Sequence, residues 1–400
     1  MANKAEHPFI RKGRDFSDYV DGAFGAVAAC MKDRELYPDL TVNATAGTFF
    51  GSDGRIAAFK TVYDVYDSMD PRIKASYASN IAGNAEFRGE VFSWINRRGN
   101  ILIPHDVIAT AGGTGAIYTA VKTCLSDGDT ILYPQIAWGN YKVIADEYNL
   151  KPLTYDIYDL NDLLDKIDAV EGKVFLIVNS PCENPLGCCL SYEEWRKIVD
   201  KLNHLGREAV LLCDIAYIDY ANNDPKKFFE LFNDLSDDVL VLIAASCSKA
   251  FSYYGQRLGA LIAIHNDPEF LDHYINLCSR LARATWSNLH NGAMINIAQV
   301  LKDHREEYLK ELKEAREMLG ERTRLFIRQA QECGLELYTS SDGFFVTLKM
   351  EDNEKRDAYH EKLIEKHIYT IKVNKGIRVG LCSTPIKVVD GLAYQLKELM

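Results

Sequence analysis

Six short apolar runs alternate with helix-like segments between about residues 100 and 290, and this alternation constrains the fold more than any other feature of the chain. Several of the runs are continuously apolar, as parallel strands are when both faces of a sheet are covered. Strands that alternate with helices in this way build a mostly parallel sheet with helices on both faces. The runs are Val107–Ala111, Thr130–Tyr133, Val174–Val178, Ala209–Cys213, Val239–Ala245 and Gly259–Ile264. The sequence therefore predicts the α/β class, with a large domain over residues 51–290.

The pattern changes after residue 290, where long and strongly charged helix-like segments run to Cys333. A strand-like run, Gly343–Leu348, then precedes a helix near Tyr359–Lys366, a strand near Ile377–Leu381 and a final helix. This mixture predicts a second, smaller α+β domain made of residues 291–400. Because the ends of a chain commonly lie together, residues 1–50 are expected to join it.

The composition limits the classes of partner. With 47% hydrophobic and 26% charged residues, the 400-residue chain is typical of a soluble globular protein. A net charge of −11 argues against general binding to nucleic acid or to an anionic membrane. The apolar runs are too short to cross a bilayer, and the polar start, Met1–Lys12, has no apolar signal core. Ten scattered cysteines indicate reduced thiols, so a cytoplasmic protein without a metal site is expected.

Lys249 is the strongest candidate for a chemical role. It ends the segment Ser246-Cys247-Ser248-Lys249, directly after the run Val239–Ala245, and Arg257 follows eight residues later. An uncharged amine can condense with an aldehyde, and two hydroxyls beside a guanidinium suit a phosphate dianion. Pyridoxal 5'-phosphate is the cofactor that needs both, and open α/β sheets bind ligands at the carboxyl ends of their strands. Taken alone, a lysine is more often a solvated surface group.

A glycine-rich segment, Gly112-Gly113-Thr114-Gly115, follows the first apolar run and precedes the helix-forming stretch Ala116–Leu125. Glycines let a backbone approach an anion closely, and the N–H groups at a helix start can bind phosphate. The segment matches neither the dinucleotide fingerprint nor the nucleotide P-loop. In isolation, a plain tight turn is an equally good interpretation.

Two further apolar runs end in polar side chains. Asn184 lies in the proline-containing loop Asn179–Gly187, which can hold its side chain above the sheet or can simply end a strand. Asp214 closes the run Ala209–Cys213, where a buried acid needs a partner. The protonated ring nitrogen of the cofactor would be such a partner, and Tyr217 could donate its hydroxyl to the ring's phenolate oxygen. A helix cap is the alternative role for Asp214.

With these motifs in matching order between about Val42 and Leu381, the chain resembles the fold-type I pyridoxal phosphate aminotransferases, in particular the aspartate and aromatic amino acid branch. The resemblance implies a mostly parallel seven-stranded sheet between helices in the large domain. It implies that Lys249 forms the internal aldimine and then shuttles a proton, and that Asp214 pairs with the ring nitrogen. Asn184 and Tyr217 would bond the phenolic oxygen, and Asn184 would also contact the substrate. The phosphate would be held by Gly113, Thr114, Ser246, Ser248 and Arg257.

The same resemblance supplies residues for stacking, for the substrate and for a neighbouring subunit. Trp138 would stack on the cofactor ring and contact the substrate, although a tryptophan is on average a core residue. Tyr77 would reach the phosphate of the neighbouring subunit. Arg378 would bind the α-carboxylate through two parallel bonds beside a backbone contact from Gly47, with a surface arginine as the alternative. Arg283 resembles the arginine that is lent across the dimer to a second carboxylate, which indicates aspartate, glutamate and their oxo acids.

Three positions depart from the family pattern. Asn179 and Tyr141 stand where the aspartate aminotransferases usually carry histidines behind the ring-binding acid, so the network around Asp214 must differ. After Ser287-Asn288, the usual pair of prolines is replaced by Leu289-His290, which can shift Arg283. The side-chain preference of the substrate site therefore stays open between dicarboxylic and aromatic amino acids.

The predicted activity is a ping-pong transamination between an L-amino acid and a 2-oxo acid such as 2-oxoglutarate. Lys249, Asp214 and Tyr217 would be the catalytic residues, and the protein would be a homodimer with shared active sites. A fold-type I lyase or decarboxylase would keep Lys249 and Asp214 and is the alternative. A nicotinamide oxidoreductase would need the glycine fingerprint, and a DNA-binding regulator would need an added basic segment.

Overall fold

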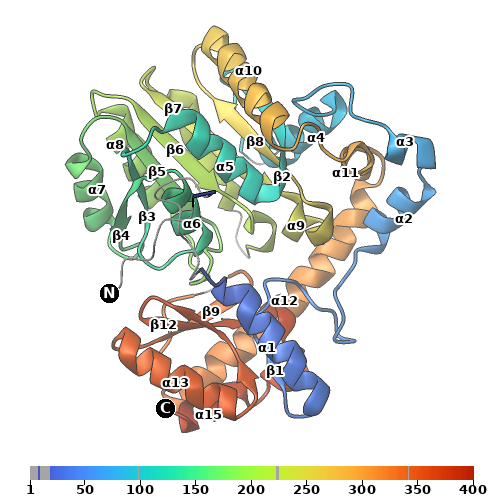
Figure 1. Cartoon of the computed structure of the whole chain (residues 1–400), viewed down its shortest axis with the longest axis vertical. Helices are drawn as coiled ribbons and strands as arrows, with labels where there is room; N and C mark the ends of the chain where they lie inside the picture. The colour runs from blue at the N-terminus through green and yellow to red at the C-terminus, as the bar shows by residue number, and fades with distance from the viewer. Residues whose placement is uncertain (1–7, 10–18, 98, 222–224, 341) are drawn as a thin grey trace.

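The computed structural model describes residues 8–9, 19–97, 99–221, 225–340 and 342–400 (Figure 1). Most of the polar start Met1–Lys12, on which the prediction about a signal segment rests, lies outside the described residues. The helices are α1 (Gly22–Leu36), α2 (Lys60–Ser68), α3 (Pro71–Ala75), α4 (Ala85–Asn96), α5 (Gly112–Cys124), α6 (Asn140–Glu147), α7 (Leu160–Ala169), α8 (Tyr192–Asn203), α9 (Cys247–Ala250), α10 (Pro268–Thr285), α11 (Asn291–Asp303), α12 (Arg305–Cys333), α13 (Asn353–Glu365), α14 (Ile386–Val389) and α15 (Leu392–Glu398). The strands are β1 (Val42–Asn43), β2 (His105–Ala111), β3 (Thr130–Pro134), β4 (Lys151–Tyr155), β5 (Val174–Asn179), β6 (Ala209–Asp214), β7 (Val239–Ser246), β8 (Leu258–Ile264), β9 (Phe345–Lys349), β10 (Ile368–Tyr369), β11 (Ile371–Val373) and β12 (Gly376–Gly380). Short 3-10 helices are η1 (Ile218–Tyr220), η2 (Pro225–Asp234), η3 (Tyr254–Gln256) and η4 (Leu381–Ser383).

Seven strands form one twisted sheet in the order β2-β8-β7-β6-β5-β3-β4 (Figure 1). β8 pairs antiparallel with β2 and β7, and the other described pairs in this sheet are parallel. Helix α5 packs against β7 and β8, and the buried side chains of α8 belong to the same apolar cluster as alternate residues of β5 (Figure 1). The predicted α/β class with a mostly parallel seven-stranded sheet is therefore confirmed.

The central strands are apolar at every position because both faces of the sheet are covered. In β5, the side chains of Val174, Leu176 and Val178 belong to one buried cluster. The intervening side chains of Phe175 and Ile177 belong to the cluster on the opposite face. Alternation along the strand thus distributes the residues between two cores, which is why no polar residue interrupts the run.

β4 is the strand that the apolar runs did not predict. It pairs with β3 at the edge of the sheet, and its first residues, Lys151 and Pro152, are exposed. A proline is tolerated at a sheet edge because its missing N–H leaves no ladder bond unmade, and an exposed lysine is a common edge residue. An edge strand with a polar start therefore lacks the signal that identified the six others.

The second part of the chain forms a small antiparallel sheet in the order β11-β12-β9. The amino-terminal strand β1 pairs with β10, with Val42 opposite Ile368. Helix α13 begins at Asn353, earlier than the sequence predicts. The Asp352 side chain caps the helix at this point because it accepts a hydrogen bond from the Lys355 N–H.

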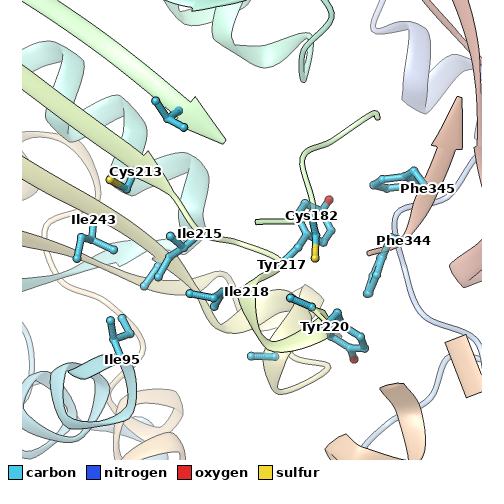
Figure 2. Packing of buried hydrophobic residues seen from close by; sticks show 14 of the residues in the cluster. Ile95, Cys182, Cys213, Ile215, Tyr217, Ile218, Tyr220, Ile243, Phe344 and Phe345 are labelled. Atoms are coloured by element: carbon cyan, nitrogen blue, oxygen red, sulfur yellow. The ribbon is translucent and has the colours of Figure 1, made fainter. Parts of the chain in front are cut away.

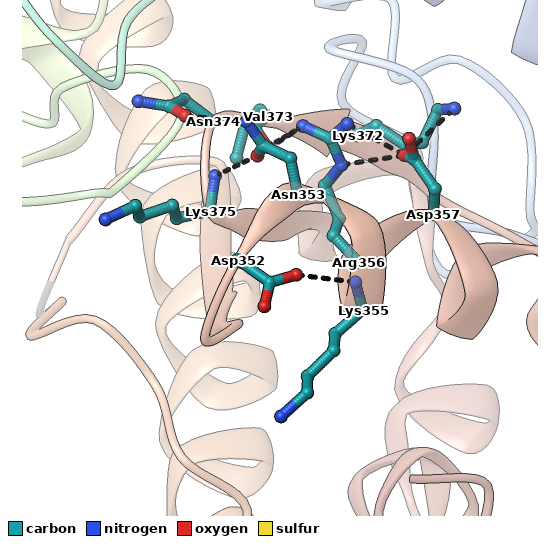
Figure 3. A network of polar contacts seen from close by, with 9 residues as sticks. All are labelled: Asp352, Asn353, Lys355, Arg356, Asp357, Lys372, Val373, Asn374 and Lys375. Carbon is teal, nitrogen blue, oxygen red and sulfur yellow. Dashed lines mark hydrogen bonds and ion pairs between the residues drawn. The ribbon is translucent and has the colours of Figure 1, made fainter.

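A polar network holds the β11–β12 hairpin against α13 (Figure 3). The Arg356 guanidinium donates to Asn353 Oδ1 and to the carbonyl oxygen of Val373, both at 2.8 Å. Asn353 Oδ1 also accepts from the backbone N–H of Lys375 at 2.8 Å. These bonds fix the turn of the hairpin whose second strand carries Arg378, so the position of that arginine depends on α13.

The long helix α12 carries a buried arginine, Arg322. Arg322 donates to the carbonyl oxygens of Phe50 and Cys382 at 2.8 and 3.0 Å, and its guanidinium lies 5.2 Å from the ring centre of Phe49. It connects α12 to the segment before α2 and to the residues after β12. The carbonyl contacts satisfy donors that burial would otherwise leave unpaired.

Two findings bear on the predicted environment. The ten cysteines all carry free thiols, as expected from their spacing. In the described part of the chain, no helix combines the length and the apolar character that crossing a membrane requires.

Candidate active site

Lys249 lies in α9, directly after the carboxyl end of β7, as the sequence predicts. Its Nζ donates to the carbonyl oxygen of Gly47 at 2.5 Å. Three aromatic rings face the amine, with centres at 4.8 Å for Tyr254, 5.6 Å for Tyr217 and 5.7 Å for Phe344. Removal from water lowers the pKa of Lys249 to about 8. Part of the amine is therefore uncharged near neutral pH, which is the form that condenses with an aldehyde.

Asp214 ends β6 beside β7 and is buried. Tyr141 Oη donates to its Oδ2 at 2.6 Å, and the N–H of Ala216 donates to its Oδ1 at 3.2 Å. Burial raises the pKa of Asp214, whereas these two donors and the nearby Lys249 act in the opposite direction. A cationic partner at this buried position would therefore stabilise the ionised form of the carboxyl group.

Asn184 and Arg378 meet above the carboxyl end of β5. Arg378, on β12, donates to Asn184 Oδ1 at 3.0 Å and to the carbonyl oxygen of Thr45 at 2.6 Å. Its guanidinium lies 4.2 Å from the ring centre of Phe345. The backbone N–H of Asn184 is held by Asn179 Oδ1 at 2.8 Å. The Nε of Arg378 is buried and has no hydrogen-bond partner within the described residues.

Tyr217 lies against two phenylalanines from the start of β9 (Figure 2). Its ring centre is 5.2 Å from that of Phe344 and 5.8 Å from that of Phe345, both edge-on. Burial raises the pKa of Tyr217 well above its usual value. The hydroxyl therefore stays protonated and can donate a hydrogen bond.

The glycine segment, the two serines and Arg257 lie together at the start of α5. The helix α5 starts at Gly112–Thr114 without a side-chain cap, so its first N–H groups are available to a ligand. Arg257 donates to Ser248 Oγ at 3.1 Å, and Ser246 Oγ accepts from the N–H of Ser248 at 3.3 Å. A Cβ at Gly112 would lie 2.6 Å from the Arg257 guanidinium, and one at Gly113 would lie 3.1 Å from Ser246 Cβ.

Trp138 precedes α6 and is partly buried. Its ring stands edge-on to Tyr141, with centres 5.6 Å apart. Tyr141 in turn bonds to Asp214, so Trp138 packs against the residue that contacts the predicted partner of the ring nitrogen. Its position is compatible with the predicted stacking.

Tyr77 and Arg283 behave differently from the other predicted site residues. The Tyr77 side chain is 85% exposed, and its backbone pairs with that of His290. Arg283 is exposed on α10 and donates to Ser287 Oγ at 2.5 Å. In the described part of this chain, both therefore lie on the surface and outside the enclosure around Lys249.

Several residues at the site were not predicted. Tyr254 faces Lys249 and also accepts a hydrogen bond from the N–H of Phe49 at 2.9 Å. Its place between Lys249 and Arg257 in the sequence was a usable signal. Cys382 donates to the carbonyl oxygen of Ala46 at 3.2 Å, and burial raises the pKa of its thiol to about 12, although Lys249 and Arg378 oppose the shift.

Phe344 and Phe345 were interpreted only as strand residues, and nothing in their spacing distinguished them from core. Tyr141 was noted as a departure from the family pattern without a contact being assigned to it.

These groups fit pyridoxal phosphate. A lysine with a lowered pKa, an uncapped helix start with two serines and an arginine, and a buried carboxyl group are the donors and acceptors that an aldehyde, a phosphate and a ring nitrogen need. The unpartnered Nε of Arg378 offers a further donor to a carboxylate.

The comparisons with known proteins agree with this geometry. A family model described as aminotransferase class I and II matches residues 74–393. The chain belongs to the aminotransferase class I and II family. The aspartate aminotransferase of Pseudomonas aeruginosa is 23% identical to this aminotransferase over 73% of this chain and 77% of its own length.

Solved structures show the same fold. An aminotransferase from Anaerococcus prevotii superposes with a TM-score of 0.92 at 29% identity, over 98% of this chain and 100% of that one. The aromatic-amino-acid aminotransferase from Burkholderia pseudomallei, solved covalently bound to pyridoxal phosphate, gives a TM-score of 0.77 at 22% identity over 95% and 97% of the two chains.

The family assignment confirms three predictions. The protein is an enzyme, its reaction is pyridoxal phosphate-dependent transamination of amino and oxo acids, and its cofactor is pyridoxal phosphate. The lyase or decarboxylase that was kept as the alternative is not favoured. The roles of individual residues and the identity of the amino donor are matters for a proposal.

Proposed function

We propose that this aminotransferase transfers the amino group of aspartate, glutamate or an aromatic amino acid to 2-oxoglutarate in a ping-pong cycle centred on Lys249. The observation that carries the proposal is one enclosure that holds a partly uncharged Lys249, the buried Asp214 and the buried Arg378. Relatives named aspartate aminotransferase and aromatic-amino-acid aminotransferase support these two classes of donor.

Lys249 first binds the cofactor covalently and, once displaced by the substrate amine, moves a proton. When bound, pyridoxal phosphate supplies an electron sink for the negative charge left at the α-carbon of the substrate. With the cofactor bound, Nζ of Lys249 would be the base that accepts the α-proton of the substrate and the acid that donates it again. The surrounding rings of Tyr254, Tyr217 and Phe344 keep water away from the amine and hold its pKa down.

The remaining polar groups orient the cofactor. Asp214 holds a proton on the ring nitrogen, and Asn184 and Tyr217 donate to the phenolic oxygen. Asn184 Oδ1 already faces Arg378, which leaves its Nδ2 as the donor on the other side of the amide. Trp138 stacks on the ring. The phosphate is bound by Gly113, Thr114, Ser246, Ser248 and Arg257, with Tyr77 contributed by a neighbouring subunit.

Arg378 binds the α-carboxylate of the substrate, using the Nε that has no partner of its own. The backbone at Gly47, beside Lys249 and Phe345, leaves room for that carboxylate because it carries no Cβ. Arg283 is contributed across the dimer and binds a second carboxylate when the substrate has one. Trp138 and Asn184 contact the substrate.

We also propose a two-fold homodimer in the cytoplasm. The exposed Tyr77 and Arg283 support shared sites, since both residues need a neighbouring chain to act. Ten free thiols support a reducing compartment. We propose two domains. Residues 51–290 form the large domain, since they contain all seven strands β2–β8 of the large sheet. Residues 1–50 and 291–400 form the small domain, since β1 pairs with β10.

The test is to reduce the purified holoenzyme with borohydride and map the labelled peptide. The proposal expects the pyridoxyl group on Lys249, and label on another lysine would overturn it. A panel of amino donors with 2-oxoglutarate, measured on the same preparation, then separates aspartate and glutamate from the aromatic amino acids.

A further inference from the structure

A buried tyrosine bonds directly to the carboxyl group that faces the cofactor ring. Tyr141 is fully buried, and its Oη donates to Asp214 Oδ2 at 2.6 Å. The distance is that of a strong hydrogen bond from a hydroxyl to a carboxylate. Tyr141 is itself held by Trp138, whose ring stands edge-on at 5.6 Å. The hydroxyl therefore has a fixed direction and a charged acceptor.

Asn179, the other residue that departs from the family pattern, does not touch the carboxylate. Its Nδ2 donates to the backbone carbonyl oxygen of Asp214 at 2.9 Å, and its Oδ1 accepts from the N–H of Asn184 at 2.8 Å. The amide is used on the backbone at both ends. Tyr141 is thus the one side chain among the described residues with a hydrogen bond to the Asp214 carboxylate, and the N–H of Ala216 supplies the second donor.

A second buried carboxyl group nearby shows what the donor from Tyr141 provides. Glu183 is also fully buried, but it receives only the N–H of Leu186 on Oε2 at 2.7 Å, and its Oε1 has no hydrogen-bond partner within the described residues. Burial raises the pKa of Glu183 well above its usual value, and the charge of Asp214 adds to the shift. Asp214 receives two hydrogen bonds and Glu183 receives one, so a negative charge is more stable on Asp214 than on Glu183.

The chemistry of a phenol differs from that of the imidazole it replaces. Burial, and then the neighbouring Asp214, raise the pKa of Tyr141 well above its usual value, so the phenol remains a donor throughout the working pH range. An imidazole titrates near pH 6.5 and changes its charge within that range. The titratable groups that interact electrostatically with the pair include Glu183, Tyr155, Lys249, Cys213 and Tyr217.

We infer that Tyr141 is a positioning residue that holds Asp214 as an oriented carboxylate, and thereby sets the position of the proton shared between Asp214 and the cofactor's ring nitrogen, in a way that does not vary with pH. The inference rests on the proposed role of Asp214. Without the phenol, the carboxylate becomes more basic, and the shared proton moves from the ring nitrogen to the carboxyl oxygen with no change in the number of protons bound.

The experiment is to load the holoenzyme with pyridoxal phosphate labelled with ¹⁵N in the ring, and to record the ring-nitrogen resonance between pH 6 and 9. In Tyr141→Phe, losing a bond to a charged group should shift the proton equilibrium toward the carboxyl by about tenfold to a hundredfold. The resonance should move toward that of an unprotonated ring, and kcat should fall by a similar factor while KM for the amino donor changes little. A resonance and a kcat equal to those of the wild type would overturn the inference.

Two matched variants separate this role from a structural one. Tyr155→Phe removes another fully buried hydroxyl, which donates to the carbonyl oxygen of Ile177 at 3.0 Å. Burial raises the pKa of Tyr155 well above its usual value, so this phenol carries no charge, and its removal should leave the ring-nitrogen resonance unchanged. Tyr141→His restores a donor that titrates, so the resonance should acquire a pH-dependent step near the pKa of an imidazole. If Tyr141→Phe fails to fold, the Tyr141→His profile decides, and a flat profile counts against the inference.

The proposed role of Asp214 is checked separately by Asp214→Asn, which should show an unprotonated ring at every pH. If Asp214→Asn keeps the wild-type resonance, the proposed function of that residue is wrong. If it loses the resonance while Tyr141→Phe does not, only the inference about Tyr141 fails.

Discussion

The predicted site residues fall into two regions of the molecule that differ in how completely one chain assembles them. Lys249, Asp214 and Asn184 lie at the carboxyl edge of the large sheet, where they share an enclosure with Arg378 from β12. Tyr77 and Arg283 belong to the same predicted site but lie exposed, on the segment before α4 and on α10. The first group is organised by a parallel sheet, and the second lies on the surface of the described part of this chain, outside that enclosure.

This difference separates the site residues that one chain brings together from those whose proposed roles require a neighbouring subunit. Carboxyl ends of neighbouring parallel strands meet at one sheet edge, so side chains placed there come together within a chain. Tyr77 is 85% exposed and has no such constraint, so its proposed role depends on the proposed neighbouring chain. The enclosed region should therefore carry the chemistry of its own chain, and the exposed region should carry specificity for a neighbour's site.

The largest effect is expected in the enclosed region. Lys249→Ala removes the amine that binds the cofactor and moves the proton, so kcat should fall roughly 10³-fold or more, while the phosphate and ring contacts still hold the cofactor. Lys142→Ala removes an exposed amine that pairs with Asp146 and should keep normal turnover. Steady-state rates and cofactor stoichiometry check both variants, and near-normal turnover in Lys249→Ala would remove this lysine from the mechanism.

The enclosure should also leave a mark on stability. In the cofactor-free protein the folded-state pKa of Lys249 is about 8, below the ordinary value of 10.5. Between these pH values the unfolded chain binds the proton and the folded chain does not, so this group's contribution to stability falls as the pH drops from about 10.5 to about 8 and is constant below. Lys249→Met should therefore raise the free energy of unfolding at pH 7 by about 3 kcal/mol.

Urea unfolding of the cofactor-free wild type and Lys249→Met at pH 7 and pH 10.5 measures this difference. The gain should be present at the lower pH and mostly absent at the higher one. Lys142→Met, on the exposed face of α6, is the matched control. A gain of equal size at both pH values would indicate better packing instead of the lost charge.

The sequence predicted the enclosed region because its signals are local. A continuous apolar run followed closely by Lys249 or by Asp214 indicates a buried strand with a polar side chain at its carboxyl end. The structure places Asp214 as the last residue of β6 and Lys249 in α9, directly after β7. Asn184 lies in a loop and Arg378 on a distant strand, and the resemblance gives each a role without predicting that they touch. Their contact at 3.0 Å is a finding of the structure.

What the sequence could not supply are contacts between segments that lack a shared pattern. The bond from Tyr141 to Asp214 joins α6 to β6. The rings of Phe344, directly before β9, and of Tyr254, in η3, both face Lys249. A phenylalanine beside a strand has the same sequence signature whether it faces a core or a ligand. The edge strand β4 was missed for the opposite reason, because Lys151 and Pro152 hide its periodicity.

A smaller effect separates the two arginines, one from each region. A buried bond to a charged group contributes about 1.5 to 3 kcal/mol, or roughly tenfold to a hundredfold in kcat/KM. Arg378→Leu should weaken every amino acid substrate alike, since all carry the α-carboxylate. Arg283→Leu should weaken aspartate and glutamate and spare phenylalanine.

Arg280→Leu, an exposed position one helical turn earlier on α10, is the matched control and should change neither class. The deciding values are kcat/KM for aspartate and for phenylalanine in all three variants. If Arg283→Leu holds its aspartate turnover while phenylalanine turnover drops, Arg283 is an interface residue, and the enzyme is a transaminase of aromatic or other apolar amino acids.

The smallest effect is the most direct measure of how the two regions combine. Chains with Lys249→Ala keep their exposed residues, and chains with Tyr77→Phe and Arg283→Ala keep their enclosed ones. In a mixed dimer, one site then takes Lys249 from the second chain and Tyr77 and Arg283 from the first, and is intact. Random pairing after mild unfolding and refolding makes half of the dimers mixed, each with one good site of two, so activity toward aspartate should return to about a quarter of the wild-type level.

Mixing without exchange of subunits is the control and should restore nothing. If exchanged mixtures stay inactive while each refolded parent keeps its cofactor, Tyr77 and Arg283 act within their own chain, and the exposed region contributes to the site only by a movement of α10 and the segment before α4.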